Sequence, residues 1–144
     1  MKRTSRIICM LLAAAMLFAI PAAAEGNAES RASNFFMSSD VYLYRTSSTT
    51  FQAWFEVSAF YTMDKLGASE IKIQKSSDNE NWTTVKTCTM ANYSNLICEN
   101  TGAHASYISY TGTSGYYYRA RITLYAKDGT ASGEWTRYTS SILL

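Results

Sequence analysis

Histidine and proline are almost absent from this chain of 144 residues, which has one of each, and cysteine occurs three times. The single histidine, His104, excludes a zinc site built from several imidazoles. After residue 20, no apolar run is long enough to cross a bilayer, and no stretch repeats apolar residues at helical spacing. These absences argue against a helical, membrane-spanning or zinc-dependent protein.

The first residues are arranged like a bacterial signal peptide. Three basic residues precede an apolar stretch over 7–20, and Pro21 is followed by three alanines. This pattern predicts cleavage between Ala24 and Glu25 and export of the mature chain, in which no membrane span is expected. We predict three parts, which are a helical signal peptide over 1–24, a flexible polar leader over 25–33 and a folded domain over 34–144.

The charge of the mature chain excludes a nucleic-acid binder. The full sequence has 13 Lys and Arg against 11 Asp and Glu, but Lys2, Arg3 and Arg6 belong to the signal peptide. The mature part is therefore slightly acidic, whereas nucleic-acid binding needs an excess of basic side chains on one face. We expect no nucleic-acid partner.

The rest of the composition is typical of β-strands. The chain has 11 Tyr, 6 Phe and 3 Trp, and these side chains suit a pleated, half-buried surface. Apolar and polar residues alternate over 51–61, 70–75 and 116–125, and Leu66-Gly67-Ala68 is expected to break the chain. We predict an all-β fold, a seven-stranded antiparallel β-sandwich; a small barrel would show the same periodicity.

Two cysteines, Cys88 and Cys98, form an even pair in the exported part of the chain. The polar run 91–95 lies between them, and their spacing suits opposed positions on a hairpin. We predict that a disulfide joins them, which would contribute about 2.8 kcal/mol on the chain-entropy model. A metal or redox pair is the alternative, although the spacing is not that of a CxxC motif.

Two further features resemble fibronectin type III domains. Trp54 lies in the second predicted strand, and Tyr116 to Ile122 reads Tyr-Tyr-Tyr-Arg-Ala-Arg-Ile. That family has a core tryptophan early and a strand of alternating aromatic, arginine and apolar residues late. The resemblance covers most of 40–144 and implies that Trp54 lies in the core. The pattern is also similar to small exported bacterial proteins of uncharacterised function with immunoglobulin-like domains.

The segment from Trp135 to Thr139 resembles a degenerate form of the Trp-Ser-x-Trp-Ser signature of fibronectin-like domains in cytokine receptors. In that family, aromatic rings interleave with arginines of the neighbouring strand. Arg119 and Arg121 are two residues apart and point to the same side, as does Tyr117. The resemblance implies a ladder of Arg119, Arg121, Trp135 and Tyr138, which would either stabilise the sheet or form a partner-binding face.

The surplus tyrosines allow two interpretations. They could form a platform for sugar rings or a protein partner, or they could pair across strands. The residues concerned are Tyr42, Tyr44, Tyr107, Tyr110, Tyr117 and Tyr125. The segment Asn34-Phe35-Phe36 similarly either caps the core or stays free to dock elsewhere.

No catalytic constellation is visible. The chain lacks a Gly-x-Ser-x-Gly elbow, its one histidine lies in a polar stretch, and its acids show no spacing that pairs two of them across a cleft. We expect no enzyme, no metal and no cofactor. The predicted function is a secreted module that binds a protein or glycan at the cell envelope or outside the cell. The alternative is a secreted structural protein without a dedicated ligand site.

Overall fold

The computed structural model describes residues 34–144, so the predicted signal peptide over 1–24 and leader over 25–33 lie outside the described residues. Every strand pairing is antiparallel, which confirms the predicted antiparallel all-β class. No helix within 34–144 is long and apolar enough to cross a membrane. The elements are β1 (Phe36–Arg45), β2 (Thr50–Ser76), β3 (Thr83–Thr89), the 3₁₀ turn η1 (Ser94–Leu96), β4 (Ile97–Thr111), β5 (Tyr117–Asp128), β6 (Ala131–Tyr138) and β7 (Ile142–Leu143).

The long strand β2 organises the fold. Its 27 residues pair with β1 and β4 in the first half and with β5 and β3 in the second half. The predicted break at Leu66-Gly67-Ala68 is wrong, because β2 continues through these residues. A Cβ atom on Gly67 would collide with the backbone oxygen of Leu96, and the φ angle of Gly67 is +155°. Glycine is therefore needed for the strand to continue at this close approach, not to end it.

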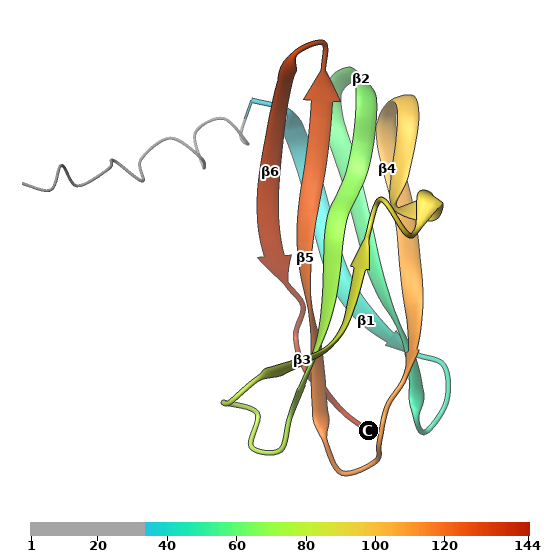
Figure 1. Ribbon diagram of the computed structural model, residues 1–144, viewed down its shortest axis with the longest axis vertical. Coiled ribbons are helices and arrows are strands. Elements are labelled where there is room, and N and C mark those ends of the chain that lie inside the picture. The colour runs from blue at the N-terminus through green and yellow to red at the C-terminus, as the bar shows by residue number, and fades with distance from the viewer. Residues whose placement is uncertain (1–33) are drawn as a thin grey trace, which may run out of the picture.

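The sheet curls until its two halves face each other (Figure 1). We call the half made of β1, the first part of β2 and β4 the β4 layer, and the half made of β6, β5, the second part of β2 and β3 the β5 layer. The prediction was a sandwich of two sheets. The structure has one open, seven-stranded sheet, because β2 runs through both layers.

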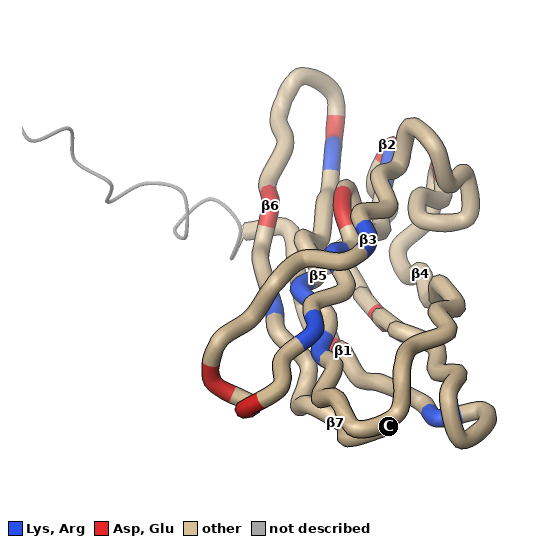
Figure 2. Tube along the Cα trace, turned by 60° about the horizontal axis from the view of Figure 1, so that its bottom comes forward, with Lys and Arg blue, Asp and Glu red and all other residues tan. Residues whose placement is uncertain are grey.

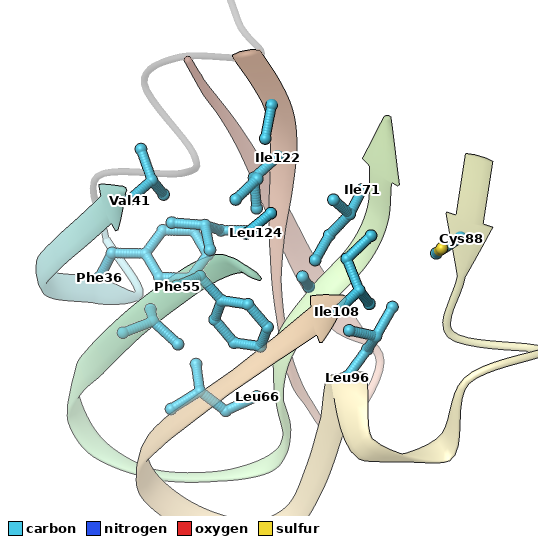
Figure 3. Close-up of a cluster of buried hydrophobic side chains, with 14 of the residues drawn as sticks. Phe36, Val41, Phe55, Leu66, Ile71, Cys88, Leu96, Ile108, Ile122 and Leu124 are labelled. Carbon is cyan, nitrogen blue, oxygen red and sulfur yellow. The ribbon is translucent and has the colours of Figure 1, made fainter. Parts of the chain in front are cut away.

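Apolar side chains fill the space between the layers (Figure 3). The residues of β2 that alternate in phase with Phe51 are buried, as predicted, and so is the alternate set of β5 from Tyr118 to Ala126. Phe35 and Phe36 are also buried, so this segment caps the core. Burying a large apolar side chain contributes roughly 1.5–3 kcal/mol, which makes this alternation the main source of stability.

Side chains bridge β6 and β1, two strands from opposite layers that the structure does not pair with each other. The rings of Trp135 and Phe36 are 6.2 Å apart. Next to them, the Arg137 guanidinium donates a hydrogen bond to the hydroxyl of Ser39 at 2.8 Å. Between β6 and β1, contacts between side chains thus take the place of hydrogen bonds between the backbones.

The loop between β3 and β4 covers the outer edge of β4. The side-chain amide of Asn95 donates hydrogen bonds to the backbone oxygen of Tyr107 at 3.0 Å and to the hydroxyl of Ser106 at 2.9 Å. The ammonium of Lys86 reaches the backbone oxygen of Ser109 at 3.3 Å. An edge whose carbonyl groups are occupied in this way is a poor template for pairing with another chain.

The predicted disulfide is wrong, because Cys88 and Cys98 are both free thiols. The two strands that contain them do not pair with each other as arms of a hairpin. They follow one another along the same edge of β2, with Cys88 opposite Ile71 and Cys98 opposite Leu66. Five residues of a strand span about 16 Å, well beyond the ~7 Å between Cα atoms that a disulfide allows. The buried Cys88 serves instead as a small apolar residue of the core.

Candidate functional site

A shallow groove of about 380 Å³ lies across the three strands of the β4 layer. We call it the Asp40–Glu56 groove. By strand alternation, the side chains of Ser38, Asp40, Glu56 and Ser58 share the outer face, away from the core. The complete set of lining residues is Ser38, Ser39, Asp40, Glu56, Val57, Ser58, Ala103, His104 and Ala105.

The register of the strands builds this groove. Asp40 and Glu56 are direct partners on β1 and β2, and Ala105 is the partner of Glu56 on β4. The methyl groups of Ala103 and Ala105 leave room beside the acids. Two like charges placed directly opposite each other destabilise a sheet. A local rule broken in this way is typical of functional sites.

Neither carboxylate of the groove forms an ion pair with any Lys, Arg or His of the described chain. One oxygen of Asp40 accepts a hydrogen bond from the backbone NH of Val41 at 2.8 Å, and one oxygen of Glu56 accepts the Tyr42 hydroxyl at 3.0 Å. Burial raises the pKa of the Tyr42 phenol, and the hydrogen bond to Glu56 and the charges of Glu56 and Asp40 raise it further. No Lys or Arg is among the residues that line the groove, and the Arg137 guanidinium reaches one of them, Ser39, at 2.8 Å.

A row of stacked aromatic rings borders the groove. Tyr42, Trp54 and Tyr107 are register partners across β1, β2 and β4. The Trp54 ring stacks on Tyr107 at 4.4 Å between centroids and lies nearly parallel to Tyr42 at 6.2 Å. The placement of Trp54 in the core, implied by the fibronectin resemblance, is therefore wrong, because Trp54 alternates with the buried Ala53 and Phe55.

For three of the six surplus tyrosines, ring contacts within the chain decide between a ligand platform and packing against other aromatic residues. Tyr42 and Tyr107 pair across strands with Trp54, so the ring faces that meet are not available to a ligand. Tyr110 packs against Phe51 and Tyr118 on the core side. A continuous flat platform of all six tyrosines is not formed, and none of the six is among the residues that line the groove.

The outer face of the β5 layer contains the arginines of the predicted ladder. The Arg119 guanidinium lies between the rings of Trp82, at 4.4 Å, and Tyr138, at 4.9 Å. Its Nε donates a hydrogen bond to Gln74 at 2.8 Å. We call these four residues the Arg119 stack. The sequence suggested Tyr138 as a partner of Arg119 but missed Trp82, which follows the turn after β2.

Trp135 does not join this stack. It is the register partner of the buried Leu124, so it lies on the core side of β6, where it contacts Phe36 and the Arg137 guanidinium at 4.7 Å. Trp135 and Tyr138 are three residues apart and must point to opposite faces of a strand. Tyr117 lies on the outer face but is opposite Ser76, at the far end of β5.

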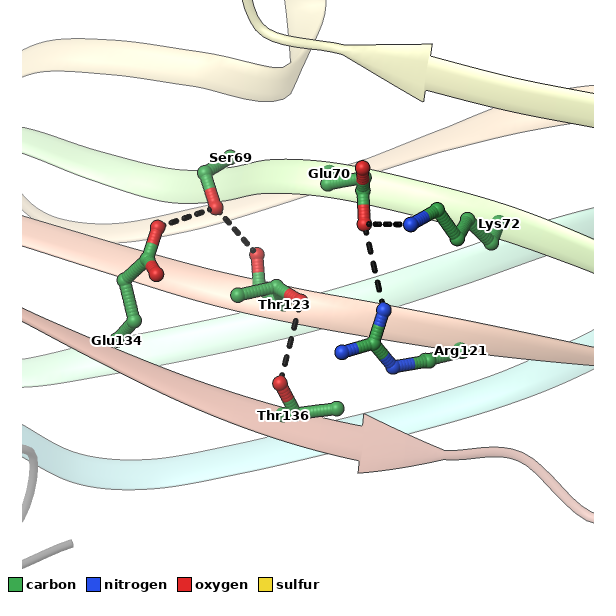
Figure 4. Close-up of polar contacts among 7 residues, drawn as sticks. All are labelled: Ser69, Glu70, Lys72, Arg121, Thr123, Glu134 and Thr136. Atoms are coloured by element: carbon green, nitrogen blue, oxygen red, sulfur yellow. Dashed lines mark hydrogen bonds and ion pairs between the residues drawn. The ribbon is translucent and has the colours of Figure 1, made fainter. Parts of the chain in front are cut away.

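Arg121 forms an ion pair instead of a cation–π contact. Its guanidinium lies 3.4 Å from Glu70, which also holds the ammonium of Lys72 at 3.0 Å (Figure 4). Beside them, the Ser69 hydroxyl donates to Glu134 at 2.8 Å. Figure 2 shows basic positions gathered along β2 and β5. The polar side chains of this face are therefore engaged with each other.

His104 takes no part in a catalytic arrangement with the groove acids. It is the register partner of Val57 on the core side, where its ring meets Phe55 edge-on at 5.6 Å. Its Nε2 is 2.9 Å from the backbone oxygen of Asn95. Among residues 34–144, no group of His, Cys, Asp and Glu side chains is arranged to hold a metal ion.

No protein-family model matches the sequence, and no curated protein matches it. Among solved structures, the fold is similar to that of the sporulation control protein Spo0M from Bacillus subtilis. The similarity has a TM-score of 0.42 at 9% sequence identity, and it covers 71% of this chain and 47% of the Spo0M chain. The match therefore spans about half of that protein.

Proposed function

We propose that this chain is an exported, non-catalytic module that binds a glycan in the Asp40–Glu56 groove. The observation that carries the proposal is a groove whose two acids, Asp40 and Glu56, are register partners and form no ion pair within residues 34–144. Carboxylates and serine hydroxyls are the groups that hydrogen-bond sugar hydroxyls, and the groove combines Asp40 and Glu56 with Ser38 and Ser58. Export rests on the signal-peptide pattern of 1–24.

The size and the rim of the groove support a small, polar ligand. A volume of about 380 Å³ falls at the lower end of the ~300–1,000 Å³ range of ligand pockets. Tyr107, which is 39% exposed, borders one end, and Phe60, which is 59% exposed, follows Ser58 toward the other end. Aromatic groups beside a groove that is lined by both polar and apolar side chains suit sugars, which have both hydroxyl groups and apolar CH faces.

A secreted structural protein without a ligand site is the second candidate. The Arg119 stack favours it, because that face is filled by contacts within the chain. A fibronectin-like ancestry belongs to the same proposal. The alternating strand β5 supports such an ancestry, and the outward position of Trp54 argues against it.

The test is a glycan array probed with the mature chain, followed by titration calorimetry on the glycans that bind. The variants Asp40→Asn and Glu56→Gln should weaken binding at least tenfold. Glu80→Gln is the matched control, because it removes one exposed carboxylate from the turn between β2 and β3. An array without signal, or equal affinity for the parent and Glu56→Gln, would contradict glycan binding in the groove.

A further inference from the structure

We infer that three basic side chains turned toward the core on edge strands keep this chain monomeric, because they block strand pairing with a second copy. They are Arg45 on β1, Lys86 on β3 and Arg137 on β6, and we call them the edge guards. The inference goes beyond the groove and does not depend on glycan binding. It concerns the sides along which an open sheet can add a strand from another molecule.

An open sheet leaves several strands with a neighbour on one side only. Within residues 34–144, β1, β3 and β4 pair with β2 alone, and β6 pairs with β5 alone. Each of these edge strands has one side on which no other described strand is hydrogen-bonded to its backbone. Such a side is a template for the edge of a second molecule, and proteins that remain monomeric protect it.

The register places each edge guard in the phase that faces the core. Residues directly opposite each other in an antiparallel pair lie on the same face of the sheet. The partners of Arg45, Lys86 and Arg137 are, in this order, the fully buried Phe51, Ile73 and Ile122. On β5, which has strands on both sides, the core-facing residues from Tyr118 to Ala126 are all apolar or aromatic. Core-facing charges therefore distinguish these edge strands from the inner strand β5.

Each edge guard reaches past its own strand and bonds to a strand across the open side of the fold. The Arg137 guanidinium donates to the Ser39 hydroxyl on β1 at 2.8 Å. The Lys86 ammonium donates to the backbone oxygen of Ser109 on β4 at 3.3 Å, and the Arg45 guanidinium donates to a backbone oxygen of β7. These contacts join the β4 layer to the β5 layer or to β7, which pairs with β5. The guards therefore lie across the sides where a strand of a second copy would be added.

Stability alone does not explain basic residues at these three positions. A valine in the core-facing phase would bury apolar surface, whereas a basic side chain has to keep its charge hydrogen-bonded. Inward-pointing charges are a known protection of edge strands against edge-to-edge association. A second copy that paired there would displace the guard and leave its charge above the core without a partner. The edge guards therefore favour specificity over stability.

Arg137 is the guard whose loss should have the largest effect. The edge of β4 is held by Lys86 and also by Asn95, whose amide donates to the backbone oxygen of Tyr107. Between β6 and β1, the second contact is the ring pair of Trp135 and Phe36, which occupies no backbone group. Replacing Arg137 by an apolar residue should therefore expose two edges that can pair with a second copy.

The test is sedimentation velocity of the mature chain over a wide range of protein concentration, with the fold checked by circular dichroism. The parent should sediment as a monomer throughout, whereas the weight-average mass of Arg137→Val should at least double at the highest concentration. Arg137→Glu and Ser39→Ala should stay monomeric, because the first keeps an inward charge and the second keeps Arg137 itself. Lys127→Val is the control for the loss of one positive charge, because Lys127 lies on the outer face of the inner strand β5.

Hydrogen exchange of the associated Arg137→Val protein locates the contact. Backbone amides of β1 or β6 should exchange at least tenfold more slowly than in the parent, because they gain strand partners. A folded Arg137→Val that stays monomeric would overturn the inference, as would equal association of Arg137→Glu, of Lys127→Val or of the parent. Association without added protection on β1 or β6 would overturn it too. If Arg137→Val does not fold, Lys86→Val replaces it, and a folded, monomeric Lys86→Val would overturn the inference.

Discussion

The two outer faces of the molecule use the same kinds of side chain in opposite ways. On the β5 layer, Arg119 is enclosed by two rings and hydrogen-bonded to Gln74, and Glu70 neutralises two basic side chains. On the β4 layer, Asp40 and Glu56 are register partners, and neither forms an ion pair within residues 34–144. The comparison teaches that composition does not distinguish a structural face from a candidate binding face. The two faces are distinguished by the strand register, which sets the partner of each residue.

The largest expected effect comes from the strand that both faces share. Gly67→Ala places a Cβ against the backbone of Leu96, which cannot move without shifting the entry into β4. We expect the free energy of unfolding in urea to fall by about 3 kcal/mol or more, with loss of glycan binding. Gly115→Ala is the control, because its φ is also positive, at +84°, but nothing lies within 4 Å. Its expected cost is about 1–2 kcal/mol. Equal costs for both variants would contradict the close approach at Gly67.

Removing the Arg119 stack should affect stability and leave binding unchanged. Arg119→Ala loses two cation–π contacts, each worth roughly 0.5–1 kcal/mol, so the free energy of unfolding should fall by about 1–2 kcal/mol. Lys127→Ala, on the same strand, is the control and should cost less than about 0.5 kcal/mol. A double-mutant cycle with Tyr138→Ala measures the coupling. Zero coupling energy would show that the stack is not a stabilising unit.

The dependence of stability on pH tests the turn after β2, which contains Asp78 and precedes Trp82. Hydrogen bonds from the side chain and backbone of Asn81, from the Glu80 NH and from Ser76 hold the pKa of the Asp78 carboxyl well below its ordinary range. A lowered pKa means that the stabilisation is complete above the ordinary pKa of ~3.9. It is lost as the pH falls from there toward the folded-state value.

The melting temperature of Asp78→Ala should therefore lie below that of the parent by a constant amount from pH 7 to about pH 5. The difference should shrink below about pH 4. We expect it to be smaller than the effect of Arg119→Ala at neutral pH. A difference that stays the same at pH 2 would show that Asp78 acts through packing and not through its charge.

The smallest effect on stability should come from the groove. Glu56→Gln removes one charge from two acidic register partners and keeps an acceptor for the Tyr42 hydroxyl, so the free energy of unfolding should stay within about 0.5 kcal/mol of the parent or rise slightly. Glycan binding is expected to fall sharply in the same variant. A loss of more than about 1 kcal/mol would place Glu56 in the structural class with Arg119 and would remove the contrast between the faces.

The alternation of apolar residues predicted the antiparallel all-β class and the buried phase correctly, but not the single curled sheet. In β2 the buried residues Phe51, Ala53 and Phe55 repeat every second residue, as do Ile122 and Leu124 in β5, and the phase of this period decides which face is buried. The long strand β2 could not be predicted, because Gly67 has the same appearance in a turn and in a strand that passes close to another backbone. The geometry of Leu96 distinguishes the two cases, and that residue is far away in the sequence.

The candidate sites could be predicted only in part, because strand pairing decides which residues become neighbours and the sequence does not show this pairing. Arg119 and Tyr138 were predicted to stack, but Trp82 comes from another part of the chain. The position of Trp135 could have been predicted from strand alternation. Trp135 and Tyr138 are three residues apart, so their side chains point to opposite faces of the strand. The groove was missed because Asp40 and Glu56 become neighbours only through the register of β1 with β2. The two cysteines were misassigned for the same reason, since short spacing does not show which strand each one pairs with.

The passage of β2 through both layers removes any boundary at which the molecule could come apart in stages. Four strands hydrogen-bond to this one segment, so loosening either half exposes the backbone of the other. In a variant that keeps Trp54 and replaces Trp82 and Trp135 by Phe, the alkylation rate of the Cys88 thiol and the tryptophan fluorescence should therefore report a single melting event, although Cys88 and Trp54 belong to opposite layers. We expect the sheet to unfold as one cooperative body, because its central strand hydrogen-bonds to strands of both layers.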